Sequence, residues 1–279
     1  MKTQKQWCKI RQNRIDDSIN KMKMIEKQKA SLSDGIWKFP EKMPGKDTTY
    51  SSIWLSNPLA EQVFKDRLSE EGLSEFNPFV AKSIISFWSK PGELVLDPFA
   101  GRTRGIVAVL MGRMYFGYEV SKKAYNSIIN EMDKFHLKAD IKNEDCINIK
   151  DMDIKASLLF SCPPYWNLEK YESVLGQLSD IKDYKEFLKA LEERIKACVS
   201  KLKDDGYAAF VIGDFRKNGD YILFHKNFIE LAGRCGLKLY DLIILQNVQF
   251  GIALHRFGSV RELKQMSKVH EYLLIFKKI

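Results

Sequence analysis

Residues 94–101 read LVLDPFAG, which is a short apolar run, an acid and a turn that ends in glycine. The apolar run predicts a buried strand over 94–96. In an open α/β sheet, ligands bind at the carboxyl ends of the strands, where this turn would lie. A glycine there lets the backbone approach a ligand closely. The first candidate binding residues are therefore Asp97, Pro98, Phe99, Ala100 and Gly101.

Strand and helix patterns alternate after this stretch. Helices are expected over 104–111, 122–135, 183–202 and 221–232, and strands over 115–120, near 141, and over 156–160, 207–212, 239–248 and 272–276. The alternation predicts a doubly wound α/β fold with a mostly parallel sheet. The last two strands have no convincing helix between them, so they are expected to form an antiparallel hairpin at the sheet edge. Its tip would carry a basic loop, with Arg256, Arg261, Lys264 and Lys268.

Acidic residues end the next two expected strands as well. Glu119 lies 22 residues after Asp97, and an acid at the end of the second strand is the usual partner of a ribose diol. Asp145, after the third strand, would suit the amino group of an adenine ring. The G-x-G-x-x-G spacing of dinucleotide sites is absent. These positions together favour a nucleoside site, and ordinary strand-end chemistry is the alternative.

The fourth expected strand runs into a rigid corner. Two prolines fix the backbone there, and an adjacent aromatic ring can stack on a planar base. Carbonyl groups of the corner can accept hydrogen bonds from an exocyclic amine. The alternative is a plain Pro-Pro turn with packing aromatic rings. The residues of this corner are Ser161, Cys162, Pro163, Pro164, Tyr165 and Trp166.

Both segments resemble motifs of the amino-group DNA methyltransferases, which methylate cytosine N4 or adenine N6. Residues 97–101 look like their first motif, and residues 161–166 look like their catalytic motif, a polar residue followed by Pro-Pro-Tyr. Residues 270–276 resemble their last strand. Phe76, Asn77 and Pro78 resemble the segment that covers the methionine end of the cofactor. The resemblance spans residues 76–276.

The resemblance implies a Rossmann-like S-adenosylmethionine methyltransferase fold and a flipped base in double-stranded DNA. It implies that the first motif cradles the cofactor, that Glu119 holds the ribose, and that Asp145 with Cys146 meets the adenine. Residues 161–165 would hold the target base. Since the recognition segments look short, the enzyme would read few base pairs or act as a homodimer. No nuclease-like cluster stands out, so a partner nuclease stays unknown.

Two departures from the family pattern bear on chemistry. Arg102-Thr103-Arg104 replaces the small residues that usually follow the first motif, so the arginines point away or contact a phosphate or carboxylate. Cys162 stands where the family has Asp, Asn or Ser. A thiol is a weak hydrogen-bonding group, and Cys resembles Ser in shape, which favours cytosine N4 over adenine N6. The order Cys then Pro argues against Cys162 as the nucleophile of cytosine C5 chemistry.

Charge is concentrated at the start of the chain of 279 residues. Residues 1–46 hold 12 basic and 5 acidic residues, a net charge of +7, whereas the remainder carries +2. We expect a basic helical arm and linker over 1–46, with a helix over 14–30, and a methyltransferase domain over 47–279, with a helix over 57–70. A basic arm suits a polyanion.

The rest of the sequence bears on the cellular compartment and on metal binding. No apolar run approaches the roughly 18 residues of a membrane helix, and the start of the chain does not look like a secretory signal. Five scattered cysteines without C-x-x-C spacing favour a reducing cytoplasm. Four scattered histidines argue against a metal site. Two alternatives remain open: methylation of RNA bases or protein glutamines, and a non-catalytic DNA-binding module.

Overall fold

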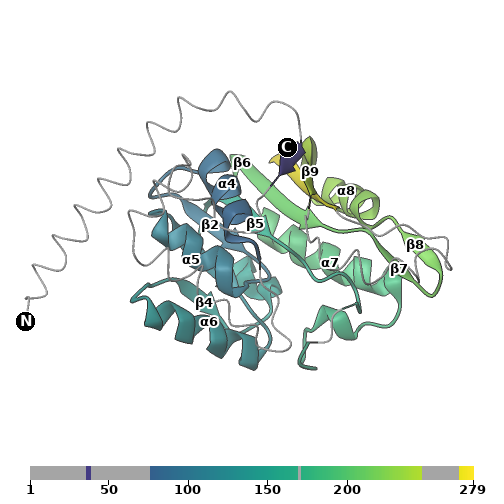
Figure 1. Ribbon diagram of the computed structural model, residues 1–279, viewed down its shortest axis with the longest axis horizontal. Helices are drawn as coiled ribbons and strands as arrows, with labels where there is room; N and C mark the ends of the chain where they lie inside the picture. Colours follow the sequence, from purple (N-terminus) through teal and green to yellow (C-terminus); the bar gives the residue numbers. More distant parts are fainter. Residues whose placement is uncertain (1–35, 39–75, 169–170, 247–269) are drawn as a thin grey trace, which may run out of the picture.

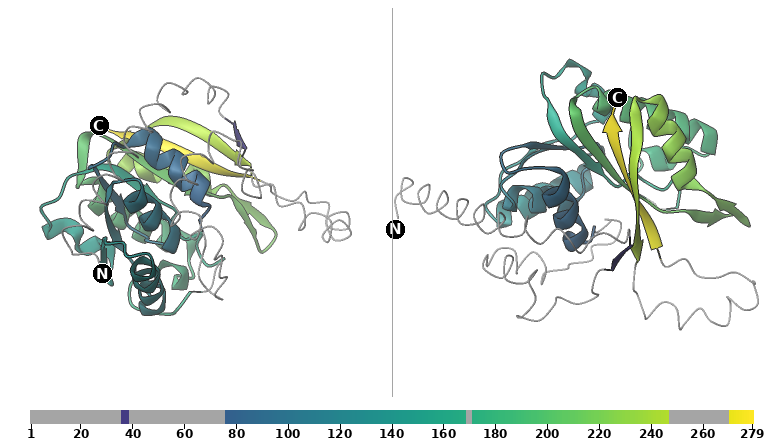
Figure 2. Two further views of the ribbon diagram at one scale, coloured as in Figure 1. Left: turned by 60° about the vertical axis from the view of Figure 1, so that its left-hand side comes forward. Right: turned by 90° about the horizontal axis from the view of Figure 1, so that it is seen from above.

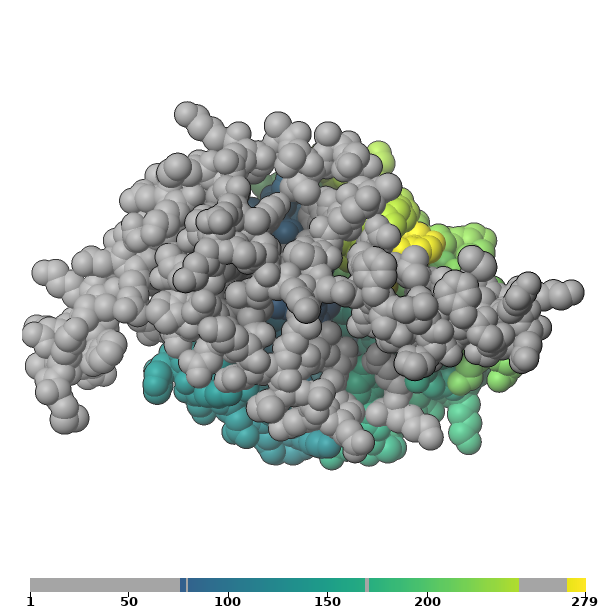
Figure 3. Space-filling model, in the orientation of Figure 1, coloured from purple at the N-terminus to yellow at the C-terminus, as the bar shows by residue number. Residues whose placement is uncertain are grey.

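A computed structural model of the protein describes residues 36–38, 76–168, 171–246 and 270–279. An eight-stranded sheet carries helices on both of its faces (Figures 1 and 2). Its strand order is β1-β9-β10-β6-β5-β2-β3-β4, and a separate two-stranded hairpin joins β7 to β8. In the space-filling view of the same orientation, α6 lies along the lower border of the visible face (Figure 3).

The elements have the following bounds. The sheet contains β1 (Ile36–Lys38), β2 (Leu94–Asp97), β3 (Met114–Tyr118), β4 (Asp140–Lys142), β5 (Ala156–Ser161), β6 (Leu202–Ile212), β9 (Leu237–Gln246) and β10 (His270–Lys278). The hairpin consists of β7 (Phe215–Lys217) and β8 (Asp220–Ile222). The helices are α4 (Pro78–Trp88), α5 (Arg102–Leu110), α6 (Lys122–Lys134), α7 (Tyr184–Val199) and α8 (Phe224–Arg234), with short 3₁₀ helices η2 (Cys146–Asp151) and η3 (Leu178–Asp180).

Strand directions confirm the expected doubly wound fold. β4, β3, β2, β5 and β6 are parallel neighbours, and β10 runs antiparallel between β6 and β9. The antiparallel β9–β10 pair is therefore present. It lies one strand in from the edge, because Ile36–Lys38 pair in parallel with β9 as β1. Those three residues fall within the stretch expected to be a linker.

The interior strands divide their side chains between two apolar clusters. Val95 packs with residues of α4, α5 and α6, whereas Leu96 packs with residues of α7 and α8. Leu158 and Leu159 on β5 divide in the same way, and all four side chains are fully buried. Successive side chains of a strand point to opposite faces, so a strand covered on both sides reads as a continuous apolar run.

Polar caps start two of the helices where the sequence predicted them. The hydroxyl of Ser121 accepts a hydrogen bond from the Ala124 amide at the start of α6. The carboxylate of Asp183 accepts one from the Glu186 amide at the start of α7. Each cap satisfies an amide that has no partner within its helix.

Two expected helices are partly wrong. The helix expected over 183–202 ends at Val199, and Leu202 already begins β6. The helix expected over 221–232 begins only at Phe224, because the two residues at 221 and 222 belong to β8. Asn218 and Gly219 have φ values of 52° and 90°, which form the tight turn between β7 and β8. An Asn-Gly pair is the strongest short-range signal for such a hairpin.

Several expectations lie outside the described residues. They are the helices over 14–30 and 57–70, the end of the strand at 247–248, and the basic loop that carries Arg256, Arg261, Lys264 and Lys268. Within the described residues, no helix is both long and apolar enough to cross a membrane. The same part of the chain contains no group of three or more residues able to hold a metal ion.

A glycine in α5 allows a close approach between helix and sheet. A Cβ atom on Gly105 would lie 2.8 Å from the Tyr115 ring and 2.9 Å from the Met132 methyl. We expect Gly105→Ala to lower the free energy of unfolding by about 1–3 kcal/mol through overpacking, measured by urea denaturation. Gly233→Ala is the matched control, since nothing lies within 4 Å of its Cβ position in α8. Equal effects of the two substitutions would contradict this prediction.

Candidate active site

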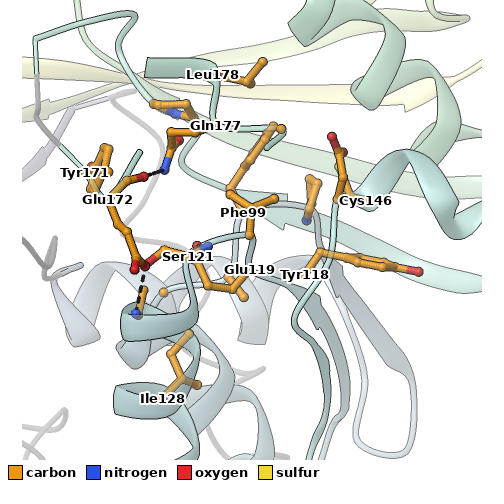
Figure 4. A pocket seen from close by; sticks show the side chains of 18 of the residues that line it. Phe99, Tyr118, Glu119, Ser121, Ile128, Cys146, Tyr171, Glu172, Gln177 and Leu178 are labelled. Atoms are coloured by element: carbon orange, nitrogen blue, oxygen red, sulfur yellow. Dashed lines mark hydrogen bonds between the residues drawn. The ribbon is translucent and has the colours of Figure 1, made fainter. Parts of the chain in front are cut away.

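A cavity of about 350 Å³ opens at the carboxyl ends of the parallel strands (Figure 4). It is bounded by the loops that follow β2, β3, β4 and β5, and on the other side by residues 171–178. Of the residues expected at the site, its lining includes Pro98, Phe99, Ala100, Gly101, Glu119, Asp145, Cys146 and Pro164. The structure thus brings together residues from four successive strand ends, as the sequence predicted.

The carboxylate of Asp97 is enclosed beneath this cavity. One oxygen accepts hydrogen bonds from the Ser161 hydroxyl at 2.5 Å and the Phe99 amide at 3.1 Å. The other accepts from Arg104 Nε at 2.7 Å and the Tyr115 hydroxyl at 2.9 Å. Asp97 and Ser161 are both fully buried. Their side chains therefore join β2, β3, β5 and α5 to one another.

Arg104 is the cation of this network. The residue is 4% exposed, and its guanidinium donates to the Phe99 carbonyl at 2.5 Å and lies 5.3 Å from the centre of the Phe76 ring. Burial is the largest effect and acts to lower the pKa of Arg104, but the charge of Asp97, the nearby Tyr115 and the hydrogen bond to Asp97 together raise the pKa above its usual value. Of the alternatives that the sequence left for this arginine, a contact with a carboxylate is the one observed.

The Phe76-Asn77-Pro78 segment lies beside this network. Phe76 packs edge-to-face against Phe160, with ring centres 5.5 Å apart. The side-chain oxygen of Asn77 accepts a hydrogen bond from the Val80 amide at 3.4 Å, which caps α4. Among the described residues, none of these three lines the cavity. Phe76 instead covers the buried Arg104.

Glu119 stands at the cavity wall just after β3. One of its carboxylate oxygens accepts a hydrogen bond from the Ser121 amide at 2.8 Å. Burial raises the pKa of Glu119 to about 7, and the negative charge of Asp97 adds to this effect. The carboxyl group of Glu119 therefore changes between its protonated and ionised forms near neutral pH.

Asp145 begins η2 and is held from two directions. It accepts a hydrogen bond from the Ile147 amide at 3.1 Å, and Arg194 of α7 forms an ion pair with it. Arg194 also lines the cavity, although no sequence motif pointed to it. Its contact with Asp145 depends on how α7 packs against η2, which is a property of the tertiary structure alone.

Residues 171–178 close the cavity on the side opposite the first motif. Figure 4 shows Tyr171, Glu172, Gln177 and Leu178 there, facing Phe99 and the start of α6. The Glu172 carboxylate accepts hydrogen bonds from the Ser121 hydroxyl at 2.7 Å and the Lys123 amide at 3.1 Å. The bond from Ser121 is the main reason that the pKa of Glu172 is lowered. These bonds fasten the segment to α6.

The Pro-Pro corner adjoins the same cavity through Pro164. The Tyr165 hydroxyl donates a hydrogen bond to Glu271 at 2.7 Å, and the Cys162 sulfur lies 3.7 Å from the same hydroxyl. The Tyr165 ring packs edge-to-face on Phe224, with centres 5.9 Å apart. Burial raises the pKa of Tyr165 well above its usual value, so its hydroxyl stays protonated. The corner thus holds Tyr165 at both its ring and its hydroxyl.

Trp166 continues the corner away from the cavity. Its φ angle is 55°, a left-handed conformation that is rare for a bulky residue. Its indole nitrogen donates to the Ile181 carbonyl at 2.8 Å, and its ring packs on Tyr184. These contacts pack Trp166 as a cap on the loop that follows the corner.

Several solved structures are similar to part of this chain. NSun6 from Pyrococcus horikoshii with SFG is 13% identical, has a TM-score of 0.50, and is matched over 74% of this chain and 52% of its own. TrmN from Thermus thermophilus is 13% identical, with a TM-score of 0.49 over 73% of this chain and 49% of its own. An rRNA methylase from Streptococcus thermophilus is 9% identical, with a TM-score of 0.47 over 74% and 99%.

The strand order and the cavity at the strand ends define a Rossmann-like fold with a ligand site at the carboxyl ends of its strands. Together with the family match given next, this makes the protein an S-adenosylmethionine-dependent methyltransferase. The family model N6_N4_Mtase, described as DNA methylase, matches residues 2–131 and 156–279. The chain belongs to this DNA methylase family. No curated protein sequence matches the chain.

The ion pair beneath the site gives a stability prediction. Arg104→Met leaves the Asp97 carboxylate buried without its cation, and we expect it to lower the free energy of unfolding by about 3–5 kcal/mol. Adding Asp97→Asn removes the buried charge and should recover most of this loss. Urea denaturation of both variants measures the effect.

Arg234→Met is the matched control for this series. Arg234 makes an exposed ion pair with Glu192, and its side chain is 55% exposed. Its loss should lower the free energy of unfolding far less than the loss of Arg104 does, because an exposed ion pair contributes little. A double variant no more stable than Arg104→Met would contradict the prediction.

Proposed function

We propose that the protein transfers a methyl group from S-adenosylmethionine to an exocyclic amino group of a base in double-stranded DNA. Cytosine N4 is favoured over adenine N6. The observation that carries the proposal is the placement of the corner 161–165, which adjoins the cavity through Pro164 and holds Tyr165 in a fixed position. Membership of the DNA methylase family supports DNA as the substrate.

The cavity fits the cofactor in size and in its donor set. A volume of about 350 Å³ is within the usual range of small-molecule sites. Glu119 can accept hydrogen bonds from the two ribose hydroxyls, and Phe99 and Leu178 offer apolar contact to the adenine. We place the cofactor against Pro98 to Gly101, Glu119, Asp145 and Cys146. When bound, the cofactor supplies an electrophilic methyl group.

Asp97 and Ser161 act in this proposal as positioning residues. Their side chains are bonded to each other and fully buried, so they fix the first motif relative to the catalytic corner. Phe76 has a similar positioning role, because its ring covers the guanidinium of Arg104. These residues set the distance between the cofactor turn and the base without touching either ligand.

The corner holds and orients the acceptor amine. An exocyclic amine is a poor nucleophile, because its lone pair is delocalised into the ring. Backbone carbonyls at 162–164 can accept its protons and favour a tetrahedral nitrogen. The Tyr165 ring, fixed by Glu271 and Phe224, offers a face for the flipped base. Cys162 supplies only a weak polar contact, and its likeness to serine in shape is the reason that cytosine N4 is favoured.

The direct test uses nucleoside mass spectrometry. The purified protein is incubated with mixed-sequence duplex DNA and S-adenosylmethionine, and the DNA is digested and analysed. We expect N4-methylcytosine, and Tyr165→Ala should abolish it. Tyr165→Phe keeps the ring but loses the hydrogen bond to Glu271, so we expect activity to fall about tenfold.

The other outcomes of this test are also informative. N6-methyladenine would overturn the preference for cytosine alone. Methyl groups found only in RNA or protein would overturn DNA as the substrate. Failure to bind S-adenosylhomocysteine in calorimetry would overturn the enzymatic proposal and favour a non-catalytic DNA-binding module.

Cofactor affinity should depend on pH through Glu119. Ribose hydroxyls donate to the ionised carboxylate, so binding favours the charged form of a group whose pKa in the free protein is about 7. Affinity for S-adenosylhomocysteine should therefore rise about tenfold between pH 6 and pH 8. Isothermal titration calorimetry across this range measures it.

Glu119→Gln should bind more weakly and lose most of this pH dependence. Glu193→Gln, an exposed change on α7, should keep the wild-type profile. An unchanged pH profile in Glu119→Gln would remove Glu119 from the cofactor site.

A further inference from the structure

The β7–β8 hairpin is an element that the methyl-transfer site does not use. It lies between β6 and α8, and in Figures 1 and 2 it projects outward from the sheet beyond α7 and α8. Its register pairs Arg216 with Tyr221 and Lys217 with Asp220. The Asn218-Gly219 turn is the tight kind that matches strand twist, so the hairpin is a preformed projection.

The base of the hairpin is packed directly against the catalytic corner. Phe215 is 7% exposed, and its ring lies 6.4 Å from that of Trp166 and 6.0 Å from that of Phe224. Trp166 follows Tyr165 in the chain, and Phe224 packs on the Tyr165 ring. Lys217 Nζ lies 5.6 Å from the centre of the Trp166 ring. The hairpin is therefore fixed relative to the place where a flipped base would enter.

The outer part of the hairpin carries an exposed cation on an exposed ring. Arg216 is exposed, and its guanidinium lies 4.8 Å from the centre of the Tyr221 ring, which is itself 42% exposed. Leu223, at the end of the hairpin, is 45% exposed. Arginine beside an aromatic ring suits a nucleic-acid strand, because the guanidinium binds phosphate and the ring stacks on a base or sugar. Asp220, which pairs with Lys217, offsets one positive charge of the hairpin. The stack of Arg216 on Tyr221 is therefore the main feature that could bind a nucleic acid.

We propose that the β7–β8 hairpin binds the nucleic-acid strand next to the target base, with Arg216 on a backbone phosphate and Tyr221 against the adjoining nucleotide. This inference rests on the proposed function, since it assumes a nucleic-acid substrate. The position of the hairpin beside the corner distinguishes it from other basic surface groups. It adds a substrate contact outside the cavity and outside the basic arm.

The chain offers a matched control at the opposite end of the sheet. Lys277 near the end of β10 also lies over aromatic rings, with Nζ 4.3 Å from the centre of Tyr240 and 5.3 Å from that of Tyr207. Tyr240 is 58% exposed. This cluster resembles the Arg216–Tyr221 stack but lies at the strand ends away from the cavity. Its loss should leave nucleic-acid binding unchanged.

The test measures binding without turnover. Fluorescence anisotropy of a labelled mixed-sequence duplex, with S-adenosylhomocysteine present, is recorded at several salt concentrations for the wild type, Arg216→Ala, Tyr221→Ala and Lys277→Ala. Arg216→Ala should weaken binding about tenfold and reduce the slope of log Kd against log salt by about 0.9, the effect of one lost phosphate contact. Tyr221→Ala should weaken binding with an unchanged slope. Arg216→Lys should restore the slope.

Calorimetry with S-adenosylhomocysteine checks that the variants keep the cofactor site intact. Wild-type affinity and slope in both Arg216→Ala and Tyr221→Ala would overturn the hairpin proposal. Equal losses in Lys277→Ala would overturn it as well, since they would reflect general charge. Duplex binding without any methylated nucleoside would overturn only the proposed reaction, and absence of duplex binding by the wild type would overturn both.

Discussion

The rest of the site depends on the hydrogen bonds and the ion pair made by the buried carboxylate of Asp97. Its oxygens accept hydrogen bonds from β5, β3 and α5 as well as from its own turn. A buried charge is tolerated only when it is paired and fully hydrogen-bonded, and Arg104 meets that requirement here. The turn after β2 and the Pro-Pro corner after β5 are thereby fixed to one another through a single side chain.

Much of the fold could be predicted from the sequence, because buried parallel strands read as continuous apolar runs between turns. The strand over 94–96, the acids that follow three strand ends and the Pro-Pro corner all have local signals, and the cavity brings them together. Arg194 and Glu271 could not be found this way, since they reach the site from α7 and β10 by tertiary packing. At 221–222 two local patterns compete: the Asn218-Gly219 pair favours a hairpin, whereas the apolar spacing favours a helix over 221–232, and the hairpin is the one formed there.

The sequence Arg102-Thr103-Arg104 departs from the family pattern, and the structure explains the arginine at position 104. A small residue at position 104 would leave Asp97 without a cation, whereas the arginine fills the space beneath Phe76 and Phe160 and supplies the charge. The substitution therefore belongs to the interior of the domain rather than to the cofactor surface. A motif can lose its usual small residues and still keep its turn when a buried ion pair holds that turn in place.

The position of β10 has a consequence for how the domain is made. This strand inserts between β6 and β9, and it also supplies Glu271 to Tyr165. During synthesis, β6 and β9 present unpaired edges until residues 270–278 have left the ribosome. These pairings are far apart in sequence and form late, so the two edges are open to aggregation until that stage. Tyr165 gains its hydrogen bond to Glu271 in the same step, so its position is fixed only once β10 has joined the sheet.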